Sequence, residues 1–269
     1  MNKATLSQFL RQVGLLRVAD QFQFRLQQWR KRKSNRAFRR SHQNIVLPPD
    51  YTMFESFQLD YRKYYEGGRN TAGWVWNQIR PHTNNLQRGK LLDWGCGPAR
   101  VVRHMPTLLG DKWRIYGTDY NQQTIDWCQK HIKEVTFSAN SVNPPLPFPD
   151  DFFDVVYGIS IFTHLSEENH VHWLEELLRI TKPGAILMFT TQGETFRARL
   201  TAAEKKAFDQ GILVVRAKVK EGHRLFSAFH PPSYLKSLFS EQATIIQHQV
   251  GEAMDWGIEQ DTWVLRNGK

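Results

Sequence analysis

Residues 91–100 combine the residue types that a loop beneath a nucleoside needs. An apolar run ends in Asp93, Gly95 and Gly97 follow one residue apart, and Pro98 stands where a helix would begin. This order predicts a strand that turns sharply into a helix, because glycine lets the backbone approach a ligand more closely than a Cβ allows. The dinucleotide pattern Gly-x-Gly-x-x-Gly would place a third glycine where this segment has its final arginine. A carboxylate ahead of the glycines favours a cationic ligand over a diphosphate, and S-adenosylmethionine fits as a nucleoside with a sulfonium group.

Polar residues also follow three further predicted strands. Asp119 lies 22 residues beyond Gly97, which suits a carboxylate that accepts both ribose hydroxyls, and Asn140 can donate and accept at an adenine edge. Ligands of open parallel sheets bind at the carboxyl ends of the strands, so these residues should meet at one edge. The predicted cofactor-binding residues are Asp93, Trp94, Gly95, Cys96, Gly97, Asp119, Tyr120, Asn140, Ser141, Gly158 and Ile159.

Alternating strands and helices must position these residues, which predicts an α/β fold. Strands are expected at 90–94, 113–118, 135–139, 154–158, 185–191, 244–250 and 262–266, and helices at 98–109, 122–132, 167–181 and 232–239. The Lys182-Pro183-Gly184 turn should end the third of these helices before the next strand begins.

The chain resembles the class I S-adenosylmethionine-dependent methyltransferases. The resemblance rests on Leu91–Gly97, Asp119, Asn140-Ser141, Leu146–Gly158 and Leu174–Ala185. It implies a Rossmann-like, seven-stranded, mostly parallel sheet with helices on both faces and a C-terminal antiparallel hairpin. It also implies that Asp93, Gly95 and Gly97 hold the methionine moiety, Asp119 the ribose, and Asn140-Ser141 the adenine. The family usually has a third glycine where this chain has Ala99.

Two histidines are the candidate catalytic residues. His164 follows the strand at 154–158 and either reaches the pocket mouth or bonds the cofactor loop, and His230, before two prolines, either faces the acceptor or is exposed. Tyr65, Arg69 and Tyr234 are candidate cap residues, and His223 is a further candidate. No His or Cys spacing typical of a metal site occurs, so no metal is expected.

These features predict methyl transfer by SN2 displacement to an oxygen, or a nitrogen, of a small molecule or glycan. Ile159–Leu165 and Ala228–Leu235 are similar to a bacterial subgroup associated with glycan and cell-surface methylation. One alternative is a non-catalytic subunit that binds the cofactor in a regulatory or scaffolding role. Another is a nucleic-acid methyltransferase, although base-amine methylases carry Asn/Asp-Pro-Pro-Tyr/Phe where this chain has Gly158–Ile161.

The N-terminal segment is strongly basic. Residues 25–40 hold eight of the basic side chains behind the net charge of +10 and no acid. Apolar positions in residues 1–24, among them Leu6, Phe9, Leu10 and Val13, predict an amphipathic helix ahead of them. Residues 5–40 could therefore meet an anionic membrane surface, nucleic acid or a protein partner, or pack as a solvated helix.

The chain should divide into a basic segment at 1–44, a cap at 45–86 and a methyltransferase domain at 87–269 with an insertion at 194–228. Its 269 residues, 41% of them apolar, suffice for one such domain with appendages. The two separated cysteines and the lack of a signal sequence or a long apolar run predict a cytoplasmic protein, peripheral at most to a membrane.

Overall fold

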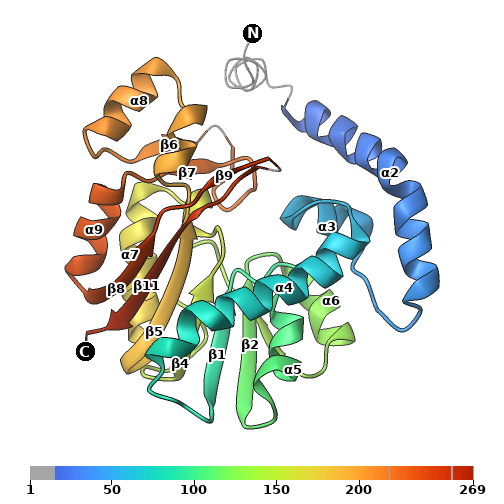
Figure 1. The fold of residues 1–269 in the computed structure, drawn as a ribbon, viewed down its shortest axis with the longest axis horizontal. Helices are drawn as coiled ribbons and strands as arrows, with labels where there is room; N and C mark the ends of the chain where they lie inside the picture. The colour runs from blue at the N-terminus through green and yellow to red at the C-terminus, as the bar shows by residue number, and fades with distance from the viewer. Residues whose placement is uncertain (1–15, 218, 256, 269) are drawn as a thin grey trace.

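The computed structural model describes residues 16–217, 219–255 and 257–268, and a twisted sheet lies at its centre (Figure 1). The seven strands are ordered β3-β2-β1-β4-β5-β11-β8, and only β11 runs antiparallel to its neighbours. The predicted Rossmann-like class is therefore confirmed. The strands are β1 (Gly89–Trp94), β2 (Trp113–Asp119), β3 (Thr136–Ala139), β4 (Phe153–Gly158), β5 (Thr181–Thr191), β8 (Ala243–Gln249) and β11 (Asp261–Asn267).

Helices cover both faces of the sheet. Successive strand residues point to opposite sides, and because the side chains on both sides are apolar, both faces need to be covered. Leu91 packs in one buried cluster with residues of α4 (Tyr61–Ile79) and α6 (Gln122–His131). Leu92 packs in the other cluster, with residues of α7 (Glu167–Arg179) and α9 (Pro232–Ser240). Both faces of the central strands are therefore apolar, and the polar residues concentrate at the strand ends.

The N-terminal helices pack together in a third cluster. Phe24 and Phe38 of α2 (Leu16–Ser41) are buried with Met53 and Phe54 of α3 (Asp50–Ser56) and with Tyr64 of α4. Residues 42–49 between α2 and α3 form neither helix nor strand, as the Pro48-Pro49 pair favours. The predicted apolar positions Leu6, Phe9, Leu10 and Val13 lie outside the described residues.

Helix α4 runs unbroken through Gly67 and Gly68, a pair that the sequence suggested would separate two short elements. A Cβ at Gly68 would lie 2.0 Å from the carbonyl oxygen of Arg100, so the glycine serves close packing of helix against backbone. In the same contact, the Tyr64 hydroxyl donates to the Pro98 carbonyl at 2.5 Å. Helix α4 therefore supports the loop that follows β1.

Two further predicted elements differ from the structure. Residues 98–109 do not form one helix, because Ala99 has φ +60°; they form turns, η2 (Val102–His104) and α5 (Met105–Leu109). Strand β5 begins at Thr181 and so includes Pro183 and Gly184, beside an irregularity in its pairing with β4 that tolerates a proline.

The remaining elements are short. The insertion holds η4 (Glu194–Arg199), α8 (Ala202–Asp209), β6 (Val214–Arg216) and β7 (Ser227–Phe229), which agrees with the predicted helical part followed by a β or irregular part. The others are η1 (Arg80–His82), η3 (Phe162–His164), β9 (Ala253–Met254) and β10 (Gly257–Ile258). Among the described helices, none is both long enough and apolar enough to cross a bilayer.

Candidate cofactor and acceptor site

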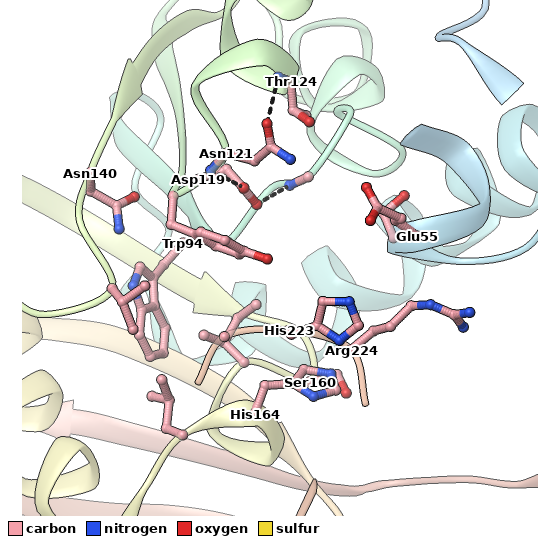
Figure 2. A pocket seen from close by; sticks show the side chains of 18 of the residues that line it. Glu55, Trp94, Asp119, Asn121, Thr124, Asn140, Ser160, His164, His223 and Arg224 are labelled. Atoms are coloured by element: carbon pink, nitrogen blue, oxygen red, sulfur yellow. Dashed lines mark hydrogen bonds between the residues drawn. The ribbon is translucent and has the colours of Figure 1, made fainter. Parts of the chain in front are cut away.

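A cavity of about 250 Å³ opens at the carboxyl ends of β1, β2 and β4. In Figure 2, Asn140 lies at one end of it and Glu55 and Arg224 at the other. Eight of the predicted cofactor residues line this cavity: Trp94, Gly95, Gly97, Asp119, Tyr120, Asn140, Ser141 and Ile159. The strand ends therefore meet at one place, as their spacing predicted.

The backbone of the glycine loop is fixed to strand β2. The amides of Gly95 and Cys96 both donate to the Thr118 carbonyl, at 2.9 and 2.8 Å. Gly95 has φ +77°, and a Cβ built there would lie 2.1 Å from Cδ1 of Ile161. The position thus requires glycine for its conformation and for the space that its neighbour occupies.

Replacing Gly95 with alanine should destabilise the protein by about 1–2 kcal/mol, because alanine disfavours the left-handed conformation and its Cβ displaces Ile161. The matched control is Gly73→Ala in α4, where no atom lies within 4 Å of the added Cβ; it should stabilise by about 0.5–1 kcal/mol. Denaturant unfolding measures both changes. Equal effects of the two substitutions would contradict the proposed strain at Gly95.

Asp119 links the glycine loop to the start of α6. One carboxylate oxygen accepts from the Gly97 amide at 3.0 Å, and the other accepts from the Asn121 amide at 2.9 Å. Asn121 in turn caps α6, because its side chain accepts from the Thr124 amide (Figure 2). Burial raises the pKa of Asp119, and the two backbone donors oppose that effect. The carboxylate is thus held at the cavity wall with its orientation set by the backbone.

Asn140 carries a buried oxygen without a partner. Its amide nitrogen donates to the Ser141 carbonyl at 2.6 Å, whereas its Oδ1 has no hydrogen-bond partner among the described residues. An orphan acceptor on a cavity wall suits a ligand that brings an N–H group, such as the exocyclic amine of adenine. The segment that follows is anchored, since the Trp173 indole donates to the Val142 carbonyl at 2.9 Å.

Three predicted cofactor residues lie behind the cavity wall instead of on it. The Asp93 carboxylate is buried and accepts from the Tyr157 hydroxyl at 2.7 Å, and burial raises the pKa of Asp93 to about 7. Burial also raises the pKa of the Cys96 thiol. Cys96 packs in the buried core, which explains why a small apolar residue occupies this position. A Cβ at Gly158 would lie 2.7 Å from the Trp94 ring, so this glycine serves packing. None of the three lines the cavity: the Asp93 carboxylate and the Cys96 thiol are buried in the interior, and Gly158 packs against Trp94.

The mouth of the cavity is formed by two segments distant in sequence. Helix α3 contributes Thr52, Glu55 and Ser56, and the connection between β6 and β7 contributes Gly222, His223 and Arg224. They belong to the predicted cap at 45–86 and the predicted insertion at 194–228, but of these residues only His223 was a candidate. The sequence signal that could have pointed to Gly222, His223 and Arg224 is a glycine followed by two basic side chains in a segment without regular structure.

His164 lines the cavity with a defined tautomer. Its Nδ1 lies 2.8 Å from the Phe226 carbonyl, which can only accept, so this nitrogen carries the proton. The second nitrogen, Nε2, then holds a lone pair and has no hydrogen-bond partner among the described residues. Burial lowers the pKa of His164, which favours this neutral form. His223 is arranged in the opposite way, since its Nδ1 accepts from the Leu225 amide.

His230 does not line the cavity, and it is not exposed, which was one of the two expectations for it. It is fully buried, and its Nε2 lies 2.9 Å from Nε2 of His170, whose Nδ1 donates to the Ser166 carbonyl. The two prolines that follow begin α9 and carry the histidine into the core. Tyr234, in the same helix, packs at the edge of that core and does not line the cavity.

The other two cap candidates lie on α4, where Tyr65 packs against the N-terminal cluster. Tyr65 packs edge-on against His104, and the Arg69 guanidinium lies 5.4 Å from the Tyr65 ring centre. Neither residue lines the cavity. Helix α4 places Tyr65 against Phe38 of α2 and His104 of η2, so the predicted cap function of Tyr65 and Arg69 has no support from this cavity.

Ser160 is a further residue of the cavity wall with an unusual backbone. It has φ +65°, and its amide donates to the Thr190 hydroxyl at 2.8 Å. The Gln260 side chain donates to the Ser160 hydroxyl at 2.7 Å and accepts from Thr190 at 2.6 Å. A non-glycine residue in the left-handed conformation must be held by its surroundings. Here Gln260, just before β11, and Thr190, near the end of β5, hold Ser160.

The methyltransferase domain family matches residues 91–184. Over 117 residues the chain is 31% identical to the tRNA (carboxymethyluridine(34)-5-O)-methyltransferase of Arabidopsis thaliana, covering 43% of this chain and 27% of that protein. Over 121 residues it is 27% identical to the ubiquinone/menaquinone biosynthesis C-methyltransferase of Burkholderia cenocepacia, covering 42% and 48%. The chain thus spans about a quarter to a half of the length of these relatives.

A solved structure gives the same fold. The S-adenosylmethionine-dependent methyltransferase of Mesorhizobium loti superposes with a TM-score of 0.55 at 13% identity, covering 71% of this chain and 97% of the other. That likeness establishes the fold. The domain match adds that residues 91–184 are similar to a methyltransferase domain.

Proposed function

We propose that the chain uses its S-adenosylmethionine-dependent methyltransferase domain to methylate a hydroxyl oxygen of a small molecule or glycan. The observation that carries the proposal is the unpaired Nε2 of His164 in the wall of the cavity. An alcohol needs a base near its oxygen to become a nucleophile, whereas a neutral amine does not.

The cavity suits the cofactor. Gly95 and Gly97 bring the backbone to the cavity wall, Asp119 offers a carboxylate to ribose hydroxyls, and the orphan oxygen of Asn140 offers an acceptor to adenine. When bound, the cofactor supplies a methyl group that its sulfonium already activates. The protein's remaining work is to align the acceptor, exclude water and take up one proton.

His164 performs the proton step in this proposal. Its Nε2 accepts the proton of the attacking hydroxyl while Nδ1–H stays on the Phe226 carbonyl, which stabilises the cation that forms. The anchoring carbonyl belongs to the same connection that carries His223 and Arg224 at the mouth. Acceptor binding and base orientation therefore depend on one segment.

The polar mouth favours an acceptor rich in hydroxyl groups. Glu55 supplies acceptors, Arg224 supplies donors, and His223, with Nδ1 accepting from Leu225, presents a donor at Nε2. Sugar hydroxyls both donate and accept, so they can satisfy all three side chains. The resemblance of residues 159–165 to glycan-modifying enzymes supports the same choice.

The test is incubation with cofactor labelled in the methyl group and three separate acceptor pools: nucleotide sugars with free monosaccharides, phenols, and total tRNA. We expect label in the sugar pool, in a form that resists alkali as an ether does. Label confined to phenols would contradict the glycan proposal, and alkali-labile label would exclude an ether.

A nucleic-acid substrate is the second candidate, since one relative is named as a tRNA methyltransferase and residues 25–40 are basic. Label in the tRNA pool alone would establish it. Cofactor binding by calorimetry without label in any pool would instead favour a non-catalytic binding subunit.

A further inference from the structure

One face of helix α2 points away from the domain and combines apolar and basic side chains. Val18, Phe22 and Trp29 are 65%, 68% and 74% exposed, which is unusual for large apolar side chains in one helix. With the exposed cations on the same face they form what we call the outer face of α2: Val18, Phe22, Arg25, Trp29, Arg32, Lys33, Arg36 and Arg40.

Helical geometry places these eight residues in a single stripe. At 100° per residue they fall within an arc of about 100°, and the helix from Val18 to Arg40 extends about 33 Å. The apolar members lie toward the N-terminal end, the cations dominate the C-terminal half, and Trp29 lies between them. Trp29, Arg32, Lys33, Arg36 and Arg40 also line one common groove.

The opposite face of α2 packs against the rest of the protein. Phe24 and Phe38 are buried there, and Lys31 pairs with Asp60. The only acid of α2, Asp20, pairs with Arg224 at the mouth of the cavity. Within the described residues, Arg32, Lys33 and Arg36 of the outer face have no ion-pair partner. The outer face thus carries cations without ion-pair partners among the described residues, and α2 runs along the side of the molecule (Figure 1).

We infer that the outer face of α2 binds an anionic lipid surface. Helices that lie in a membrane interface carry cations for the lipid headgroups beside Trp and Phe side chains that enter the acyl boundary. A surface for single-stranded nucleic acid would use aromatic side chains among its cations for base stacking, and it would not need apolar side chains beyond them. Here Val18 and Phe22 extend the stripe beyond its cations, where entry into an apolar phase would bury them. The inference does not depend on the proposed function.

The test is co-sedimentation of the full chain with vesicles of phosphatidylcholine alone and with 40% phosphatidylglycerol. We expect binding to the anionic vesicles only, weakened as salt rises. Each cation near such a surface contributes about a fivefold factor, so Arg32→Glu/Lys33→Glu/Arg36→Glu should weaken binding by about a hundredfold or more. The variant Phe22→Ser/Trp29→Ser should weaken it without altering the charge.

The matched control reverses three exposed cations elsewhere, Lys112→Glu/Arg114→Glu/Lys130→Glu, and should reduce binding by less than fivefold. Circular dichroism checks that each variant is folded. Equal binding to neutral vesicles, or equal losses in the two triple variants, would overturn the inference. So would vesicle binding that survives Phe22→Ser/Trp29→Ser while a single-stranded RNA oligonucleotide binds more tightly, which would assign the face to nucleic acid.

Discussion

Replacing Asp119 with alanine is expected to weaken S-adenosylmethionine binding by about a hundredfold or more. The substitution leaves the Gly97 and Asn121 amides without their acceptor, and each unpaired buried donor costs about 1–3 kcal/mol. It also removes the carboxylate that the cavity offers to a ribose. Isothermal titration calorimetry with S-adenosylmethionine and with S-adenosylhomocysteine measures the loss.

The control for this experiment is Asp126→Ala in the neighbouring helix α6. Asp126 is exposed and accepts only from the Gln122 side chain, so its loss removes the same charge without touching the cavity. Its affinity should stay within twofold of the unaltered chain. Unchanged affinity of a folded Asp119→Ala protein would refute the assignment of the cavity.

His164→Gln is expected to slow methyl transfer by 10²–10⁴-fold, the usual contribution of a general base, while cofactor affinity stays within threefold. The glutamine side-chain amide can still donate to the Phe226 carbonyl, but it has no basic nitrogen that could take up the proton in place of His164 Nε2. His172→Gln is the matched control, because His172 is exposed on α7 and should leave the rate unchanged. A rate within threefold for His164→Gln would remove the base from the mechanism.

The pH dependence of the rate provides a separate criterion. A base acts in its neutral form, and burial lowers the pKa of His164 below its usual 6.5. Activity should therefore be constant at neutral pH and fall only as the pH drops below 6.5, through that lowered pKa. The acid limb should disappear in the residual activity of His164→Gln. An acid limb that persists in the variant would assign it to another group.

The sheet and most of the cofactor wall could be predicted because their signals are local. Apolar runs bounded by Asp93, Asp119 and Asn140 mark strand ends, and parallel strands bring such ends together without knowledge of any side-chain contact. The conformation of Gly95 follows from its residue type alone. The same reasoning could not show which way Asp93 points, because alternation along β1 decides whether a carboxylate faces the cavity or the core; in the structure it is buried and accepts from the Tyr157 hydroxyl.

The acceptor side could not be predicted because it depends on contacts between distant segments. Glu55 and Arg224 lie on a helix and a connection that meet only in the folded chain. The Gly67-Gly68 pair has the composition of a break, yet it allows α4 to pack on the Arg100 backbone. His230 likewise has the composition of an exposed turn, and its burial follows only from the position of His170.

The position of β11 in the sheet has a consequence for how the protein is made. β11 pairs with β5 and β8 on its two sides, and residues 192–260 are synthesised between β5 and β11. Until residue 267 has left the ribosome, β5 is an edge strand with unpaired backbone groups and β8 lacks its only partner. A nascent chain with an open apolar edge is prone to aggregation, so we expect folding of this domain to depend on chaperones until synthesis passes β11.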